Sequence, residues 1–179
     1  EGSQMDNTTN YTQPAADGLV PHSAAPRKVE INLDAARCFL QALDPHSNKF
    51  TFQTFDDSPA KRKILARVLH GTLDEHAQVL AALNAQGAGI FVTINETDLH
   101  GRTAKNIRTV RAVFADFDGT SPESLRGCPI LPSIAVESSP GRWHAYWLVT
   151  GLPLDQFSTL QNTISARYGS GPSVIEVSR

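Results

Sequence analysis

Residues 113–119 read Val-Phe-Ala-Asp-Phe-Asp-Gly, an apolar run that carries two carboxylates one residue apart and ends at a glycine. Side chains alternate between the two faces of a β-strand, so this pattern predicts a strand with Asp116 and Asp118 on the same face. Two such carboxylates repel each other unless a cation lies between them. Mg²⁺ and Mn²⁺ prefer oxygen ligands, so the pair predicts a site for one of these ions. For an Asp-x-Asp pair alone, a strand end with two solvated acids is the alternative.

The composition is typical of a globular domain. The chain has 179 residues, 40% of them hydrophobic and 19% charged, which is enough for one core. It contains no apolar run of membrane-spanning length and no secretory signal, which predicts a cytoplasmic protein without membrane contacts. Cys38 and Cys128 form no Cys-x-x-Cys pair, so neither zinc nor a disulfide framework is expected. With a net charge of −2, any nucleic-acid contact must come from a local cluster of cations.

The two ends of the chain predict its domain organisation. The first 26 residues contain no lysine or arginine and no apolar periodicity. Residues 1–28 are therefore expected to form a flexible tail, in which residues 1–4 precede a native start at Met5. Residues 29–179 are expected to form one domain that lacks its C-terminal part, because the chain stops directly after an apolar run.

Helical and strand patterns alternate through this domain. Asn32 is a good N-cap for a helix over 33–43, and the Thr72 to Glu75 capping box begins a second helix that ends near Gly87. A third helix is expected at 154–168, with Phe157, Leu160 and Ile164 on its inner face. Strands are expected at 49–55, 89–94, 113–118, 133–138, 143–149 and 173–178, with a partly helical connector at 102–109.

The turn Ser139-Pro140-Gly141-Arg142 joins two of these strands. Proline second and glycine third suit a type II turn, so the pattern predicts a hairpin. Helices and hairpin-linked strands in this order predict an α+β fold with a largely antiparallel sheet.

The same hairpin turn predicts an anion site. The hydroxyls of Ser138 and Ser139, the backbone N–H of Gly141 and the cation of Arg142 together suit a phosphate. His144 follows the turn and could donate to a triphosphate oxygen if its strand lies beside the aspartate strand. A partly buried structural histidine is the alternative.

Two further features carry charge near this region. Glu176 interrupts an apolar run, where an unpaired buried acid would be costly, so a third metal ligand or a salt bridge is expected. Residues 102–111 hold four cations and no acid. Such a run is ordinarily a solvated face, but its position before the aspartate strand favours contacts to nucleotide or template phosphates, assigned to Arg102, Arg108 and Arg111.

Residues 116–120, taken alone, resemble the nucleophile motif of haloacid-dehalogenase-type phosphatases, in which the first aspartate is phosphorylated and the second acts as acid/base. Those enzymes need a downstream lysine and a further acidic cluster. Here every lysine precedes Asp116, and nothing after it resembles the acidic pair. A phosphatase that uses Asp116 is therefore the less favoured interpretation.

A longer stretch, from about Asn32 to Arg179, resembles the archaeo-eukaryotic primase superfamily, specifically the RepB-like primase domains of plasmids and mobile elements. The matching segments are residues 50–57, 69–73, 91–98, the Asp116/Asp118 strand and residues 137–147. In that superfamily an Asp-x-Asp strand binds metals, a Ser-to-His hairpin binds the phosphates of the incoming nucleotide, and a third acid after the last helix completes the metal site. The third acid here is glutamate where aspartate is usual, and the basic, proline-containing segment expected after Arg179 is absent.

The resemblance implies a DNA primase, a nucleotidyltransferase that makes short primers on single-stranded DNA from nucleoside triphosphates by two-metal phosphoryl transfer. It implies an RNA-recognition-like catalytic sheet packed with helices and a smaller α/β lobe. The implied metal ligands and catalytic residues, for two Mg²⁺ or Mn²⁺ ions, are Asp116, Asp118 and Glu176. The implied nucleotide-binding residues are Ser138, Ser139, Arg142 and His144.

Single-stranded DNA, nucleoside triphosphates and either a replicative helicase or a further C-terminal domain are the expected partners. Trp143 and Tyr146 are candidates for stacking on a base. A non-catalytic nucleic-acid-binding module for replication initiation, with the same fold, is the alternative function.

Overall fold

A computed structural model describes residues 31–118, 127–169 and 175–179, with only the backbone of Asp118. Residues 31–179 form one compact unit. The predicted tail at 1–28 and the first residues of the predicted strand at 173–178 lie outside the described residues. Within the described ranges, no helix is both long enough and apolar enough to cross a membrane.

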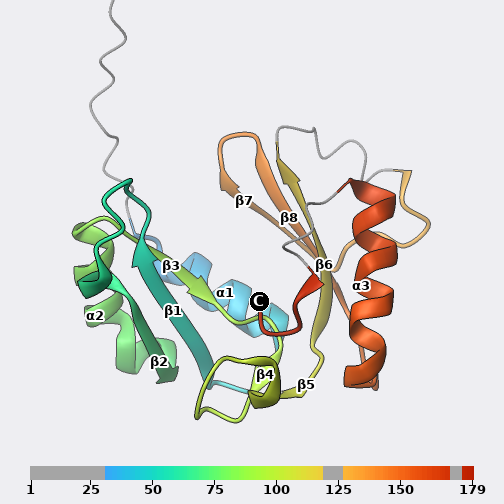
Figure 1. Ribbon diagram of the computed structural model, residues 1–179, viewed down its shortest axis with the longest axis horizontal. Helices are drawn as coiled ribbons and strands as arrows, with labels where there is room; N and C mark the ends of the chain where they lie inside the picture. Colours follow the sequence, from blue (N-terminus) through green and yellow to red (C-terminus); the bar gives the residue numbers. More distant parts are fainter. Residues whose placement is uncertain (1–30, 119–126, 170–174) are drawn as a thin grey trace, which may run out of the picture. The chain divides into compact units, whose positions relative to one another are not determined.

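The first sheet has three antiparallel strands in the order β2-β1-β3 (Figure 1). The central strand β1 (Phe50–Asp56) pairs with β2 (Arg67–Gly71) on one side and with β3 (Ala88–Val92) on the other. Helix α2 (Leu73–Ala85) follows β2 and begins at the predicted capping box. Strand β2 was not predicted from the sequence, because its five residues show no clear alternation of apolar and polar side chains.

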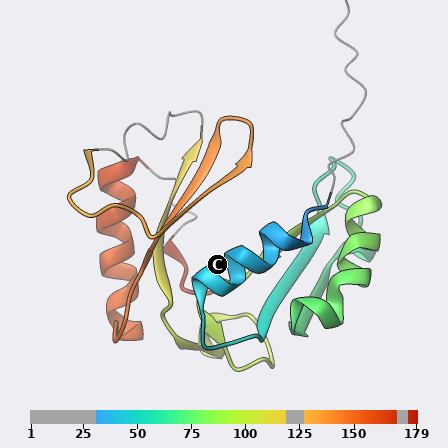
Figure 2. The same cartoon turned by 180° about the vertical axis from the view of Figure 1, so that it is seen from behind.

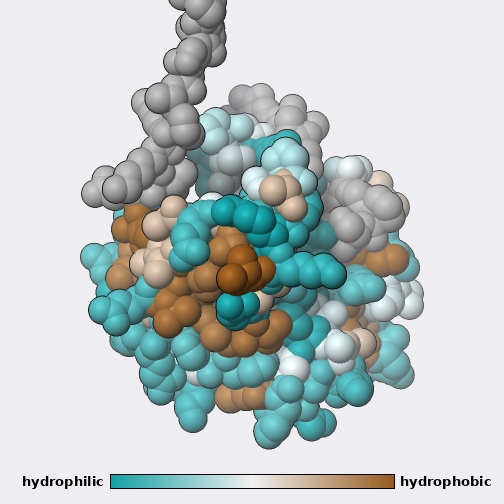
Figure 3. All heavy atoms as spheres, turned by 60° about the vertical axis from the view of Figure 1, so that its left-hand side comes forward, coloured by the Kyte–Doolittle hydropathy of each residue, from teal (hydrophilic) through white to brown (hydrophobic). Residues whose placement is uncertain are grey.

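One face of the first sheet is buried and the other is partly open. Phe50 and Phe52 are 2% and 3% exposed and belong to the main core. The exposed apolar residues of this sheet and its connections include Ile64, Val68 and Phe91. Figure 3 shows apolar side chains gathered on this side of the molecule, with hydrophilic residues around them.

The second sheet is also antiparallel, in the order β6-β8-β7. Its strands are β6 (Ala112–Asp118), β7 (Ile134–Ser139) and β8 (Arg142–Leu148). Gly141 has a φ of +75°, which fits the type II turn predicted for the β7–β8 hairpin. Two short strands, β4 (Glu96–Thr97) and β5 (Ile107–Thr109), form a small ribbon.

Helix α3 (Leu154–Tyr168) packs against β6 through a polar side chain. The amide of Gln161 pairs with the backbone of Phe114: its oxygen accepts from the N–H at 3.1 Å, and its nitrogen donates to the carbonyl at 2.5 Å. Gln161 therefore satisfies backbone groups on the edge of β6 that β8 does not cover. The predicted inner-face residue Leu160 is 36% exposed, whereas Gln161 is fully buried, so the prediction for Leu160 was wrong.

Helix α1 (Leu33–Leu43) is capped by Asn32, as predicted, and contributes Leu40 and Leu43 to the main core. Figure 2 shows this helix in front of the two sheets. The same core includes residues of both sheets, among them Phe52 of β1 and Phe114 of β6. The predicted connector at 102–109 contains a 3-10 turn, η2 (Ala104–Asn106), and then β5. The prediction of a mixed α+β fold with antiparallel sheets is confirmed.

We expect Gln161→Leu to lower the free energy of unfolding by about 1–3 kcal/mol, because a buried N–H and a buried carbonyl of Phe114 lose their partner. Urea unfolding followed by circular dichroism measures the change. Gln156→Leu on the exposed face of the same helix is the matched control and should change stability by less than about 0.5 kcal/mol. Equal stabilities for the two variants would contradict the proposed role of the amide pair.

Candidate active site

Asp116 and His144 lie side by side at the end of the second sheet. They are directly opposite in the β6–β8 register, and His144 Nδ1 is 3.8 Å from Asp116 Oδ1. The same ring nitrogen is 3.3 Å from the hydroxyl of Tyr146 on β8. The histidine strand thus lies beside the aspartate strand, which was the condition for a role of His144 at this site.

Arg179 is the closest described charge partner of Asp116. One of its guanidinium nitrogens donates to Asp116 Oδ2 at 2.7 Å, and its side chain is 38% exposed. The Asp116 carboxylate, 16% exposed, thus has an imidazole near one oxygen and a cation on the other. Sequence analysis assigned no role to Arg179. The feature of the sequence that could have indicated a role for Arg179 is its position three residues after Glu176, the predicted third acid.

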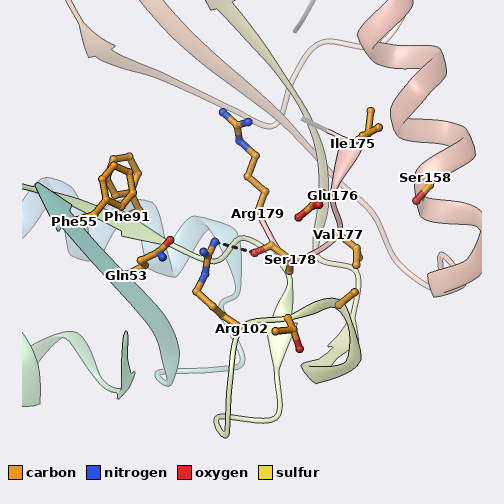
Figure 4. A pocket seen from close by; sticks show the side chains of 12 residues that line it. Gln53, Phe55, Phe91, Arg102, Ser158, Ile175, Glu176, Val177, Ser178 and Arg179 are labelled. Atoms are coloured by element: carbon orange, nitrogen blue, oxygen red, sulfur yellow. Dashed lines mark hydrogen bonds between the residues drawn. The ribbon is translucent and has the colours of Figure 1, made fainter. Parts of the chain in front are cut away.

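The segment Ile175–Arg179 is held by three contacts from residues near the middle of the chain. The carbonyl of Arg179 accepts from the N–H of Ile94 at 3.0 Å, and the carbonyl of Val177 accepts from Asn95 Nδ2 at 2.9 Å. Arg102 donates to the carbonyl of Ser178 at 3.0 Å, drawn as a dashed line in Figure 4.

The predicted strand at 173–178 is wrong for its described part. Residues 175–178 contain a turn, in which the N–H of Arg179 donates to the carbonyl of Glu176 at 3.1 Å. The carbonyls that a neighbouring strand would pair are bound by the side chains of Asn95 and Arg102 instead.

Asn95 is fully buried and binds two other segments. Its side-chain oxygen accepts from the N–H of Arg111 at 3.0 Å and of Ala112 at 3.4 Å, at the start of β6. Its nitrogen binds Val177. One amide therefore joins β6 to the segment that carries Arg179.

A cleft of about 920 Å³ lies beside this segment. One wall holds Glu176 and Arg179, and another holds Gln53, Phe55 and Phe91 of the first sheet (Figure 4). Glu176 is exposed at this wall. Burial lowers the pKa of Arg102, and the nearby Glu176 carboxylate acts in the opposite direction.

The predicted metal site is only partly visible. Among the residues that the structure describes, no three His, Cys, Asp or Glu side chains are grouped to hold a metal ion. The side chain of Asp118 lies outside that set, although its backbone ends β6. The combination of Asp116, Asp118 and Glu176 therefore stays a prediction.

The hairpin brings the predicted phosphate-binding residues to the Asp118 end of β6. Arg142 is opposite Asp118 on one side and Ser139 on the other. Ser138 Oγ donates to the carbonyl of Arg142 at 3.3 Å. The predicted anion donor, the N–H of Gly141, instead donates to the carboxylate of Glu137 at 3.0 Å.

A comparison with solved structures identifies a similar fold. The AEP domain of the primase-polymerase (PrimPol) of cyanophage S-2L matches with a TM-score of 0.65 and 17% sequence identity, over 83% of this chain and 79% of that chain. The fold is that of a primase-polymerase domain. No protein-family profile and no curated protein sequence matches the chain. At this identity the likeness concerns the fold alone.

Within this fold, the three arginines of the basic run at 102–111 have different surroundings. Arg102 lines the cleft and holds Ser178, and Arg108 is exposed with its guanidinium 3.3 Å from Asp98. Arg111 is 8% exposed, binds Asp44 at 2.7 Å and lies 4.9 Å from the ring centre of Phe50. The geometry argues against a phosphate contact by Arg111, because its charge is buried and paired.

The aromatic side chains predicted to stack on a base are buried or half-buried. Tyr146 is 7% exposed and contacts Phe39 and Phe114. Burial, together with the nearby Asp116 carboxylate, raises the pKa of Tyr146 well above its usual value, so its hydroxyl stays protonated beside His144. Trp143 is half-buried and packs on the cluster around Ala115 and Phe117.

We expect Asn95→Ala to destabilise the protein by about 2–4 kcal/mol, because buried groups on two segments lose hydrogen bonds at once. Guanidinium unfolding measures the change. Asn84→Ala is the control, since Asn84 is half-buried and donates one hydrogen bond, to the carbonyl of Ala88. A smaller loss for Asn95→Ala than for Asn84→Ala would show that Asn95 does not join the segments.

Proposed function

We propose that this protein is a DNA primase that joins nucleoside triphosphates into short primers on single-stranded DNA. The observation that carries the proposal is the register of β6 and β8, which sets Asp116 beside His144 in a chain with a primase-polymerase fold. The same fold likeness favours this function over a haloacid-dehalogenase-type phosphatase. The sequence resemblance to RepB-like primases supports a role in the replication of a plasmid or other mobile element.

The donor atoms at Asp116 fit a hard divalent cation. The carboxylate already has a cation, Arg179, as its partner, and the candidate ligands offer oxygen atoms only. We assign Asp116, Asp118 and Glu176 to two Mg²⁺ or Mn²⁺ ions. Such ions lower the pKa of the attacking 3′-hydroxyl and stabilise the charge that develops during phosphoryl transfer.

The protein's own groups would position the nucleotide. His144 uses Nδ1 toward Asp116 and Tyr146, so we assign Nε2 to an oxygen of the triphosphate. Ser138, Ser139 and Arg142 sit at the same end of the sheet, and we assign them to the triphosphate as well. Their contribution is orientation, because hydroxyl and guanidinium groups hold phosphates without transferring protons.

Asp116→Asn combined with Asp118→Asn is expected to reduce nucleotide incorporation at least about 100-fold, since the substituted amides no longer neutralise the cations. Labelled ribo- and deoxyribonucleotides with single-stranded DNA and Mg²⁺ or Mn²⁺ report the product. Asp155→Asn, at the exposed start of α3, is the matched control and should retain full activity.

The outcomes separate the alternatives. Incorporation by the double variant at the wild-type rate would place the site elsewhere. A wild type that binds DNA but never incorporates a nucleotide would support the non-catalytic initiator module. Release of phosphate from small phosphoesters, without incorporation of nucleotides, would support the phosphatase function instead.

Arg179→Gln is expected to tighten Mn²⁺ binding about tenfold in the absence of nucleotide, because a competing charge leaves Asp116 Oδ2. Isothermal titration of the nucleotide-free protein measures the affinity. Arg37→Gln on α1, which contacts Asp34 and Asp74, controls for the loss of a surface charge. Weaker binding by Arg179→Gln would mean that Arg179 supports the cation site rather than competes for it.

A further inference from the structure

The open face of the first sheet carries a row of side chains, of which Gln53 and Phe91 line the cleft. In the register, Gln53 of β1 is opposite Val68 of β2 and Phe91 of β3. Cross-strand partners share a face of the sheet, so these three residues form a continuous row. Val68 is 44% exposed and Phe91 is 42% exposed, whereas the opposite face is buried in the core.

Phe55 and Phe91 form a stacked pair on this face. Their ring centres are 4.3 Å apart and the ring planes differ by 7°. The cross-strand partner of Phe55 is Gly89, and a Cβ on Gly89 would crowd the Asp57 carboxylate and approach the Phe91 ring to 2.7 Å. The missing side chain at Gly89 therefore gives the Phe91 ring the space to lie over Phe55.

Both rings line the cleft whose other wall holds Arg179 and Glu176 (Figure 4). Arg102 lines the cleft between these walls. The aromatic pair is thus part of the same cleft as the residue that contacts Asp116.

The connection that follows β1 carries positive charge. The connection from β1 to β2 and the strand β2 itself span residues 57–71, and from Ser58 onward this stretch contains no acid. The exposed cations of the connection are Lys61, Arg62 and Lys63. Arg67 of β2 is opposite Thr54 and so lies on the other face of the sheet from Gln53. Arg62 is bound to the buried carboxylate of Asp56 at 2.7 Å, which fixes the connection to the sheet. The aromatic pair lines its cleft together with Arg102 and Arg179. Cations in the same cleft as an open aromatic pair complement the phosphates and bases of an unpaired strand.

We infer that the open face formed by Gln53, Phe55, Val68 and Phe91 is a stacking platform for unpaired bases of single-stranded DNA, with the Phe91 ring as its main contact. This inference rests on the proposed function only in assigning the bound strand as the template. Base stacking on an aromatic ring tolerates any sequence, which is what a strand copied along its length requires. The β1–β2 connection supplies charge for the backbone.

Charge favours DNA over a second copy of this chain. A partner protein on this face would bury cations of the cleft such as Arg102, which is costly unless acids pair with them. A polyanion pairs with such cations and still leaves their side chains in water.

The test is fluorescence anisotropy of a labelled oligothymidylate with the intact protein, without nucleotide or divalent metal. Phe91→Ala is expected to weaken binding about tenfold, and Phe91→Leu nearly as much, whereas Phe91→Tyr keeps the ring and the affinity. Val79→Ala, which truncates a 48% exposed side chain on α2, is the matched control and should bind like the wild type.

The salt dependence gives a second readout. Lys61→Ala with Lys63→Ala should flatten the dependence of affinity on salt concentration, because fewer counterions are released. Phe91→Ala should leave that slope unchanged, since a ring contacts bases rather than phosphates. Gly89→Ala, whose added Cβ would crowd both the Phe91 ring and the Asp57 carboxylate, should weaken binding as well.

Wild-type affinity in Phe91→Ala, or no binding of the oligonucleotide by the wild type, overturns the platform. Equal loss in Phe91→Leu and Phe91→Tyr also overturns it, since a ring would then be irrelevant. An oligouridylate in parallel tells whether the platform distinguishes DNA from RNA, and tighter binding of RNA overturns the assignment to DNA. Asp116→Asn should bind DNA normally. A wild type that binds DNA but incorporates no nucleotide would contradict the proposed function and not the platform. Variants of Phe91 that lose DNA binding but keep full incorporation would contradict the assignment of the bound strand as the template.

Discussion

The buried side-chain amide of Asn95 is the interaction on which the site depends most. It accepts from two backbone N–H groups at the start of β6 and donates to Val177. Ile94, its neighbour, binds the carbonyl of Arg179 directly. Asn95 therefore helps to position Arg179 at Asp116, together with Ile94 and Arg102, and satisfies groups that would otherwise be left without partners away from water.

The strand that carries Asp116 is an edge strand, and both of its sides are used. On one side β8 supplies His144 in register, and on the other Gln161 of α3 binds the backbone of Phe114. An edge strand leaves its polar end open to a ligand while its middle stays anchored. The two interactions together hold the Asp116 carboxylate at the rim of the sheet without burying it completely.

Local signals in the sequence predicted a large part of this arrangement. The cap at Asn32, the capping box at Thr72 and the turn at Gly141 depend on neighbouring residues only, and each was predicted correctly. Alternation in β6 and in β8 predicted the strands that bring Asp116 and His144 together. What could not be predicted depends on partners far along the chain.

The residues that were missed or misassigned have partners far along the chain. Gln161 is a polar residue at a core position, and its burial is explained by its hydrogen bonds to the backbone of Phe114. Arg111 looked like part of a basic surface until Asp44, far earlier in the chain, proved to be its partner. The contact of Arg179 with Asp116 also couples two equilibria: a ligand at Asp116 Oδ2 competes with the guanidinium for that oxygen. By reciprocity, a change that strengthens the Arg179–Asp116 contact weakens such a ligand by the same free energy.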